Sequence, residues 1–152
     1  MENSKLQKML EAHKLWIDSN KKQGEQANFF GADLREVDLC EVDLSEVSFY
    51  GADLRGVDFY RARLCGADFR ESDLRGANFR GSDLRGCDLR ETNLRGCDLR
   101  KSNLYKTDFR GSDIYKANFY KADFRGSDIR GVDFCGANLY EANLDFFDRN
   151  FA

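Results

Sequence analysis

A five-residue repeat runs through most of this sequence and limits the folds that the chain can adopt. Counting every fifth residue from Phe29 to Leu144 gives 24 central positions, and each of them is Leu, Phe or Ile. A small residue lies two places before each centre, and Asp or Asn lies one place before it except at Ser48 and Arg63. The residue after the centre is mostly Arg or Tyr, and Gly follows in half of the repeats.

A period of five fits neither a straight helix nor a flat strand. At about 100° per residue, successive centres on a helix would lie about 140° apart and would form no apolar stripe. Side chains alternate along a strand, so an odd period would place every second centre on the wrong face. If the chain turns once per repeat, the centre and the small residue both point inward, and the Gly-rich position takes the corner. The repeat therefore predicts a chain that coils around its own apolar core.

Several repeats resemble the A-(D/N)-L-x-x unit of pentapeptide-repeat proteins, among them Ala32–Glu36, Ala52–Gly56 and Ala77–Gly81. The resemblance extends over about 120 of the 152 residues. It implies an all-β fold, a right-handed quadrilateral parallel β-helix with four repeats in each coil. The 24 repeats would then make about six coils, a rod roughly 29 Å long at about 4.8 Å per coil.

The sequence outside the repeat predicts a cap at each end, because an open coil exposes its core and unpaired backbone groups. We divide the chain into an N-terminal capping helix and connector at 1–24, the repeat β-helix at 25–145 and an aromatic cap at 146–152. Ser4–Gln7 resembles a capping box, and Gly24 is a typical helix stop. A helix from about residue 4 to residue 19 would place one apolar face over the first coil, formed by Leu6, Met9, Leu10, His13, Trp16 and Ile17.

Aromatic residues at the two predicted caps suggest different roles. We expect Trp16 to plug the core of the first coil, and His13 to lie packed or at the edge of the same contact. Phe146, Phe147 and Phe151 follow the end of the repeat. They either fold over the last coil as a lid or pack against a second molecule, and the two arrangements can coexist. The second arrangement would give a weak homodimer through the C-terminal tip.

Charge is distributed unevenly along the predicted rod. The whole chain has a net charge of −3, which indicates neither a basic nucleic-acid binder nor a strongly acidic protein. Residues 29–66 carry a net charge of −4, residues 67–130 carry +3 and residues 131–152 carry −3. The basic middle is weak against the phosphate density of a duplex, so we expect no nucleic-acid partner.

Four repeats per coil would stack residues 20 apart on one face, which converts the sequence into a surface map. One face, called the third face here, has at the position after the centre Cys40, Tyr60, Arg80, Arg100, Tyr120 and Tyr140. Tyr and Arg are enriched at the energetic centres of protein interfaces. The candidate partner surface on this face comprises Arg80, Arg100, Lys101, Tyr120, Lys121 and Tyr140. The alternative is that the arginines form a salt-bridge lattice with neighbouring Asp residues and that Tyr simply suits exposed strand positions.

The residue types that carry catalysis or hold cofactors do not form a recognisable set in this sequence. His13 is the only histidine, which excludes any mechanism that needs two imidazoles. The five cysteines are odd in number, and no two have the C-x-x-C spacing of a zinc site. With no hydrophobic signal segment or transmembrane run, we expect free thiols, a cytoplasmic location and no membrane association. We predict no cofactor, no metal site and no enzymatic activity.

Two functional hypotheses follow. The first is a non-enzymatic protein-interaction module, a rigid β-solenoid that presents a patterned Arg, Asp and Tyr surface to a cytoplasmic protein. The family resemblance implies at most that such a contact has a regulatory role. The second comes from the family resemblance, because some pentapeptide-repeat proteins mimic DNA and bind DNA gyrase or topoisomerase IV in quinolone resistance. This chain differs from them in its basic middle, its uninterrupted repeats and its short tail, so we rank this hypothesis second.

Overall fold

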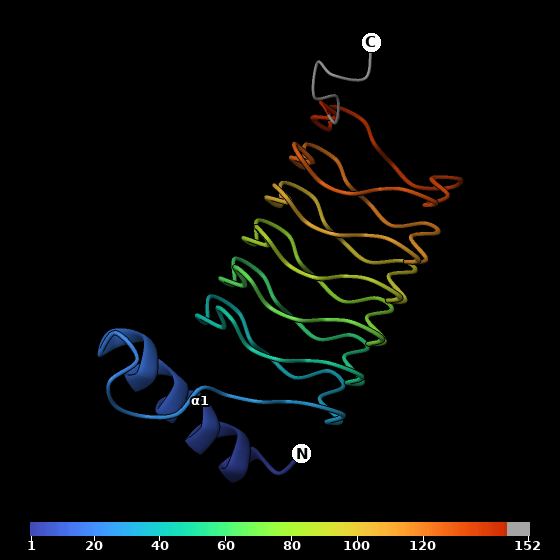
Figure 1. The fold of residues 1–152 in the computed structure, drawn as a ribbon. Helices are drawn as coiled ribbons and strands as arrows, with labels where there is room; N and C mark the ends of the chain where they lie inside the picture. Colours follow the sequence, from blue (N-terminus) through green and yellow to red (C-terminus); the bar gives the residue numbers. More distant parts are fainter. Residues whose placement is uncertain (146–152) are drawn as a thin grey trace.

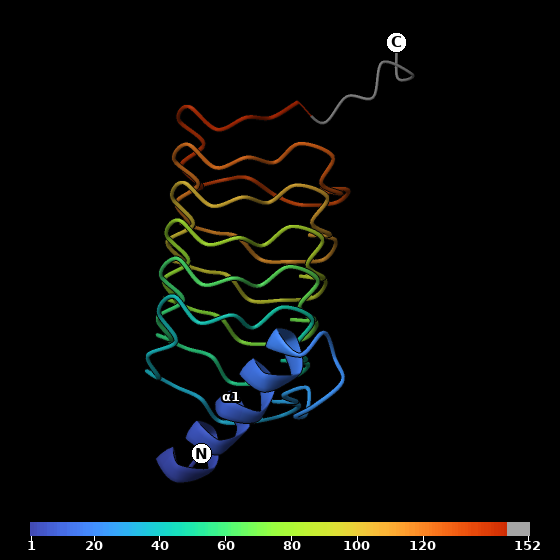
Figure 2. The ribbon, with the colours of Figure 1, turned by 90° about the vertical axis from the view of Figure 1, so that its left-hand side faces the viewer.

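In the computed structural model, which describes residues 1–145, a helix is followed by a stack of coils (Figure 1). The helix, α1 (Asn3–Asp18), crosses the N-terminal end of the stack, and the chain then winds steadily toward the C-terminal end (Figure 2). The aromatic residues Phe146, Phe147 and Phe151 lie outside the described residues. The molecule is therefore a repeat β-solenoid preceded by one helix, and the solenoid is what the repeat predicts.

Successive coils are joined by parallel bridges between residues 20 apart. Asp33 bridges Asp53, which in turn bridges Asp73 in the next coil. The Leu34 N–H donates to the Asp53 carbonyl at 2.9 Å, and the Asp53 N–H donates to the Ala32 carbonyl at 2.9 Å. Four repeats thus make one turn. Among residues 1–145 the pairing consists of single-residue bridges stacked in ladders. No strand is longer than one residue there, because a corner interrupts the extended backbone in every repeat.

Each corner is a tight turn between two repeats. The Ala32 N–H donates to the Phe29 carbonyl at 3.0 Å, and Gly31 at the third position of this turn has φ of 62°. A positive φ there is characteristic of a type II turn and explains why Gly is frequent at this position. Lys101 and Glu141 occupy the same position with φ of 57° and 56°, so the coil also holds long charged residues in a strained conformation. These charged corners project from the edges of the rod.

The centres of the repeats form a continuous apolar core. Phe49 and Phe69 stack with their rings 4.9 Å apart, and Phe59 and Phe79 form a second stack at 4.9 Å. The small inward positions tolerate hydroxyl groups, since the Ser72 hydroxyl donates to the Phe69 carbonyl at 2.6 Å. A buried polar group with such a partner avoids most of its desolvation penalty. The small position can therefore be Ser or Thr without loss of the fold.

Helix α1 covers the first coil with Leu6 and His13, which are both buried. The predicted capping box is wrong, since the helix begins at Asn3 and its N-cap residue Glu2 makes no side-chain cap. The Leu6 N–H donates to the Glu2 carbonyl at 3.0 Å, which is the ordinary first hydrogen bond of a helix. Within the described chain, no helix has the length and apolar character needed to cross a bilayer.

The plug of the first coil is His13 and not Trp16. The His13 side chain is 1% exposed, and its Nδ1 accepts the Ala27 N–H at 3.2 Å. Burial lowers the pKa of His13, although Asp43 and Glu46 act in the opposite direction. Trp16 is only half-buried and stacks on the His13 ring at 5.5 Å. The imidazole is preferred inside because it satisfies a backbone donor that the first coil would otherwise leave unpaired, which an indole cannot do.

Candidate functional site

The surface of the solenoid is built on one local motif, in which a side-chain carboxylate holds the turn that follows it. Asp98 Oδ1 accepts the backbone N–H of Arg100 at 3.1 Å. The Arg100 guanidinium then donates to both carboxylate oxygens, with Nε–Oδ1 at 2.8 Å and Nη2–Oδ2 at 2.6 Å. Such two-pronged pairs are directional and are favoured by the planar guanidinium. The repeat sequence Asp-x-Arg therefore neutralises its own arginine.

Ten arginines are held in this way, each with an Nη2–Oδ2 distance between 2.6 and 2.8 Å. They are Arg35, Arg55, Arg70, Arg75, Arg85, Arg90, Arg100, Arg110, Arg125 and Arg130. Some also reach the next coil, as Arg110 Nε does to Asp128 Oδ2 at 3.5 Å. The hydrogen bond from Arg110 lowers the pKa of Asp108, so this carboxylate stays ionised at a lower pH than an ordinary Asp does. The salt-bridge lattice is confirmed for these ten residues.

Arg80 on the third face is different, because Asn78 stands where the motif has Asp. Asn78 Oδ1 still accepts the Arg80 backbone N–H at 3.0 Å, so the turn is preserved. The Asn78 amide donates to Asp58 Oδ1 at 3.1 Å in the neighbouring coil. Within residues 1–145 the exposed Arg80 guanidinium has no ion-pair partner. Asn93 replaces Asp in the same way before Arg95, but the Arg95 guanidinium donates to Asp113 of the next coil at 3.1 Å. Among the arginines of this motif in residues 1–145, only Arg80 is therefore left without an ion pair and available to a ligand.

Farther along the third face, two tyrosines form an ordered cluster with a lysine. The Tyr120 and Tyr140 rings are stacked 5.9 Å apart at an interplanar angle of 7°. The Lys121 ammonium lies 5.2 Å from the centre of the Tyr120 ring and 3.5 Å from Glu141 Oε2. Tyr140 is 68% exposed. We call Tyr120, Lys121, Tyr140 and Glu141 the tyrosine cluster.

The structure places the six candidate residues on one side of the rod but does not join all of them. Arg80, Arg100, Tyr120 and Tyr140 share a column, because the residues two places before them are linked by consecutive bridges. Arg100 is already ion-paired with Asp98. Lys101 is exposed at a corner and has no ion pair among the described residues. The column confirms the surface map, while partner binding by these residues stays a prediction.

The candidate residues predicted from the sequence do not include Glu141. Its position 20 residues after Lys121 predicts that the two side chains lie together, because residues 20 apart stack on one face. The same spacing would have revealed a second exposed aromatic stack. Phe30 and Tyr50 lie 5.5 Å apart, and the Arg70 guanidinium carbon is 5.2 Å from the Tyr50 ring centre. Phe30 is 68% exposed. Stacks across coils are thus a general consequence of the 20-residue turn.

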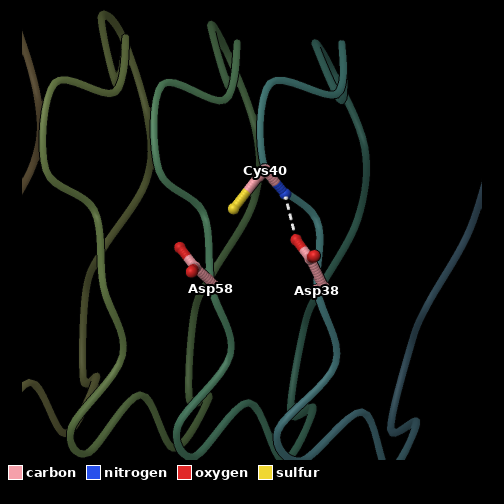
Figure 3. Close-up of side chains that lie close together, drawn as sticks. All are labelled: Asp38, Cys40 and Asp58. Carbon is pink, nitrogen blue, oxygen red and sulfur yellow. Dashed lines mark hydrogen bonds between the residues drawn. The ribbon is translucent and has the colours of Figure 1, made fainter.

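A cysteine and two carboxylates gather on the first coils, as Figure 3 shows. Asp38, Cys40 and Asp58 bring one potential ligand atom each to within 4.8 Å of the others. Asp38 Oδ1 accepts the Cys40 N–H at 2.9 Å. Burial raises the pKa of the Cys40 thiol to about 12, and hydrogen bonds to both carboxylates act in the same direction. In the absence of a metal ion the thiol therefore stays protonated at neutral pH.

All five cysteines are free thiols, as predicted. Cys87 and Cys97 point into the core, where each Sγ–H donates to a backbone carbonyl, Leu64 at 2.8 Å and Leu74 at 2.7 Å. Burial raises the pKa of both thiols. These two residues act as small apolar side chains of the core.

A family model described as pentapeptide repeats matches the chain in overlapping segments, at residues 25–59, 52–91, 78–114, 92–131 and 117–147. This chain belongs to the pentapeptide-repeat family. The match spans the whole solenoid and begins in the connector that follows α1. Among curated proteins, none matches this chain.

Several solved structures of pentapeptide-repeat proteins are similar to this chain. A protein from the Arabidopsis thaliana thylakoid lumen is 29% identical over 69% of this chain and 70% of that one, with a TM-score of 0.35. A protein from Nostoc PCC 7120 is 28% identical over 75% of this chain and 81% of that one, with a TM-score of 0.36. Full-length QnrB1, a plasmid-mediated fluoroquinolone resistance protein, is 21% identical over 82% of this chain and 85% of that one, with a TM-score of 0.35.

Proposed function

We propose that this protein is a non-enzymatic interaction module whose third face binds another protein in the cytoplasm. The observation that carries the proposal is the tyrosine cluster, which lies in the same column as the unpaired guanidinium of Arg80. We take the solenoid to be right-handed with about six coils, as the family resemblance implies. A rigid rod of this kind offers its partner a surface that is already ordered, which reduces the entropy lost on binding.

The chemistry of the third face favours a partner with carboxylates beside apolar groups. Arg80 and Lys101 have no ion pair among the described residues, so a partner carboxylate would replace water and not an existing bond. The tyrosine stack adds a flat apolar surface with hydroxyl groups at its edge, a combination that is enriched at interface hot spots. Elsewhere most arginines are already held by Asp, so the third face is the best candidate for specific recognition.

The proposal is tested by capture of partners from a lysate of the source cells. The variant Arg80→Ala/Arg100→Ala/Tyr120→Ala changes the third face, and Arg75→Ala/Arg95→Ala/Tyr115→Ala makes the same three changes one repeat earlier on the adjacent face. We expect a partner that the wild type and the control capture and the third-face variant loses. A partner captured equally by both variants would contradict the assignment of this face.

The DNA-mimic hypothesis predicts a different result in a direct assay. A DNA mimic needs a continuous negative potential, whereas Arg80, Lys101 and Lys121 lie along the middle of this rod. We therefore expect that micromolar protein neither inhibits DNA gyrase supercoiling nor protects the enzyme from a quinolone. Clear protection would reverse the ranking of the two hypotheses.

A further inference from the structure

A groove lies between α1 and the first coils, at the opposite end of the rod from the tyrosine cluster. Its volume is about 530 Å³, which is in the range of ligand and peptide pockets. Three half-buried aliphatic side chains contribute to its lining, Leu10 and Ile17 from α1 and Val42 from the first coil. We call this the cap groove. Leu10 and Val42 also pack against the core of the coil, but α1 fully buries only Leu6 and His13, so part of these aliphatic side chains stays accessible in the groove.

The rim of the cap groove is acidic. Five carboxylates line it, and two of them are paired within the groove, Asp18 with Lys14 at 2.6 Å and Asp43 with Arg63 at 3.9 Å. The other three carboxylates have no ion pair among residues 1–145; they belong to Glu11, Asp38 and Glu41.

The unpaired carboxylates come from both walls of the groove. Glu11 is on the helix and accepts one hydrogen bond from the Gln7 amide at 3.2 Å. Asp38 and Glu41 are on the coil, and Asp38 lies beside Asp58 of the next coil (Figure 3). Three uncompensated negative charges around an apolar surface create a local negative potential that attracts cations.

The combination of an acidic rim and an apolar lining selects among ligand classes. Nucleic acids and anionic membranes are repelled by the rim, and a small metal ion would gain nothing from Leu10, Ile17 and Val42. A peptide with lysine or arginine on either side of an aliphatic residue satisfies both features, because long basic side chains also bury their methylene stems. We propose that the cap groove binds a short cationic amphipathic segment of a partner protein. This site is separate from the third face and does not depend on it.

The binding test uses the full-length protein and a fluorescein-labelled peptide, Lys-Leu-Arg-Lys-Leu-Arg, followed by fluorescence anisotropy. The variant Glu11→Gln/Glu41→Gln removes one unpaired carboxylate from each wall. The matched control, Glu71→Gln/Glu91→Gln, removes the same charge at two corners outside the groove. Glu71 and Glu91 have φ of 58° and 59° and Glu41 has 60°, so the corner substitutions are equivalent in backbone conformation. Circular dichroism and the melting temperature of each variant show whether its fold is intact.

We expect the groove variant to bind the peptide at least tenfold more weakly than the wild type, and the control to bind within twofold of it. A second peptide with Ser in place of both Leu residues should bind several-fold more weakly, because it cannot use the apolar lining. Equal weakening by both protein variants would show attraction to the net charge alone and would overturn the proposal. Equal binding of the Leu and Ser peptides would overturn it as well, since the aliphatic side chains would then play no part.

Discussion

The two ends of the solenoid are built from the same repeat but differ in how well they protect its core. At the N-terminal end, Leu34 and Leu39 are 0% exposed beneath α1. At the C-terminal end of the described chain, Phe134 and Leu139 are half-exposed and Leu144 is 37% exposed. The central residues are of the same type at both ends, so the difference arises from the element that covers them.

Backbone pairing is also more complete at the N-terminal end than near the C-terminal end of the described chain. The first coil has an unusual partner for a backbone donor, since His13 accepts the Ala27 N–H. Near the other end, Asp113 bridges Asn93 of the preceding coil but does not bridge Asp133 of the next coil, whereas Asp108 and Asp128 in the neighbouring column bridge each other. The residues two places after Asp113 and Asp133 are Tyr115 and Cys135, so neither carboxylate has an arginine from its own repeat, although Arg95 of the preceding coil reaches Asp113 at 3.1 Å.

The exposure of the central residues at each end therefore depends on whether another element covers the terminal coil. Each coil contacts its two neighbours, and a terminal coil has lost one of them. A short helix compensates for that loss at one end by burying Leu6 and His13. At the other end the same loss leaves apolar surface available for a lid or for a second molecule.

The largest expected effect comes from a charge in the middle of the core. Leu94→Asp places a carboxylate where the side chain is 0% exposed, and we expect the variant to be unfolded by far-ultraviolet circular dichroism. The matched change at the open end, Leu144→Asp, should lower the melting temperature only slightly, because water already reaches this position. An unchanged melting temperature for Leu94→Asp would contradict the inward orientation of the centres.

A smaller loss of stability is expected when a Leu side chain is shortened to Ala at either end of the solenoid. Leu6→Ala removes a side chain that is 8% exposed under the helix, and we expect the free energy of unfolding to fall by about 2–3 kcal/mol. Leu139→Ala at the open end should lower it by about 1 kcal/mol, because less apolar area is buried there. Urea unfolding followed by circular dichroism measures both. Equal losses would show that the C-terminal end is also covered.

Acid should weaken the N-terminal cap before it affects the open end. Folding lowers the pKa of His13, so the unfolded chain binds more protons than the folded chain between the folded-state pKa and about pH 6.5. The contribution of His13 to stability is therefore complete above that pH and falls as the pH decreases toward the folded-state pKa. Trp16 stacks on His13, so its fluorescence should report the change. A His13→Gln variant should lose this pH dependence while Trp16 remains. If the pH dependence of the fluorescence persisted in the variant, it would arise from another group.

The smallest expected effect concerns association through the open end. We expect the aromatic residues Phe147 and Phe151, which follow the described chain, to join two molecules weakly about a two-fold axis, since α1 occupies the opposite end. Sedimentation equilibrium should detect dimers of the wild type and fewer dimers of Phe147→Ser/Phe151→Ser. Phe30→Ser, which removes an exposed aromatic residue near the other end, is the control. A wild type that stays monomeric at several hundred micromolar would leave these residues with the role of a lid.

Much of the fold could be predicted from the sequence, because a period of five allows few solutions. A residue such as Leu94 must point inward whatever its neighbours are, and the residue two places later must turn. The family resemblance implies four repeats per coil, and this alone predicts that Arg80, Arg100, Tyr120 and Tyr140 lie in one column. These inferences depend on local geometry that every repeat shares.

The details of the site and of the caps were decided by tertiary structure. Arg80 and Arg95 both follow an Asn in the motif, yet among the described residues only Arg95 reaches a carboxylate of the next coil, Asp113 at 3.1 Å. His13 and not Trp16 plugs the first coil because the backbone N–H of Ala27 needs an acceptor. The cap groove exists because of the way in which α1 meets the first coil. A periodic sequence determines the contacts that repeat, because each coil has the same neighbours. The contacts that occur once, at an end or between a helix and a coil, depend on how unlike elements meet in space.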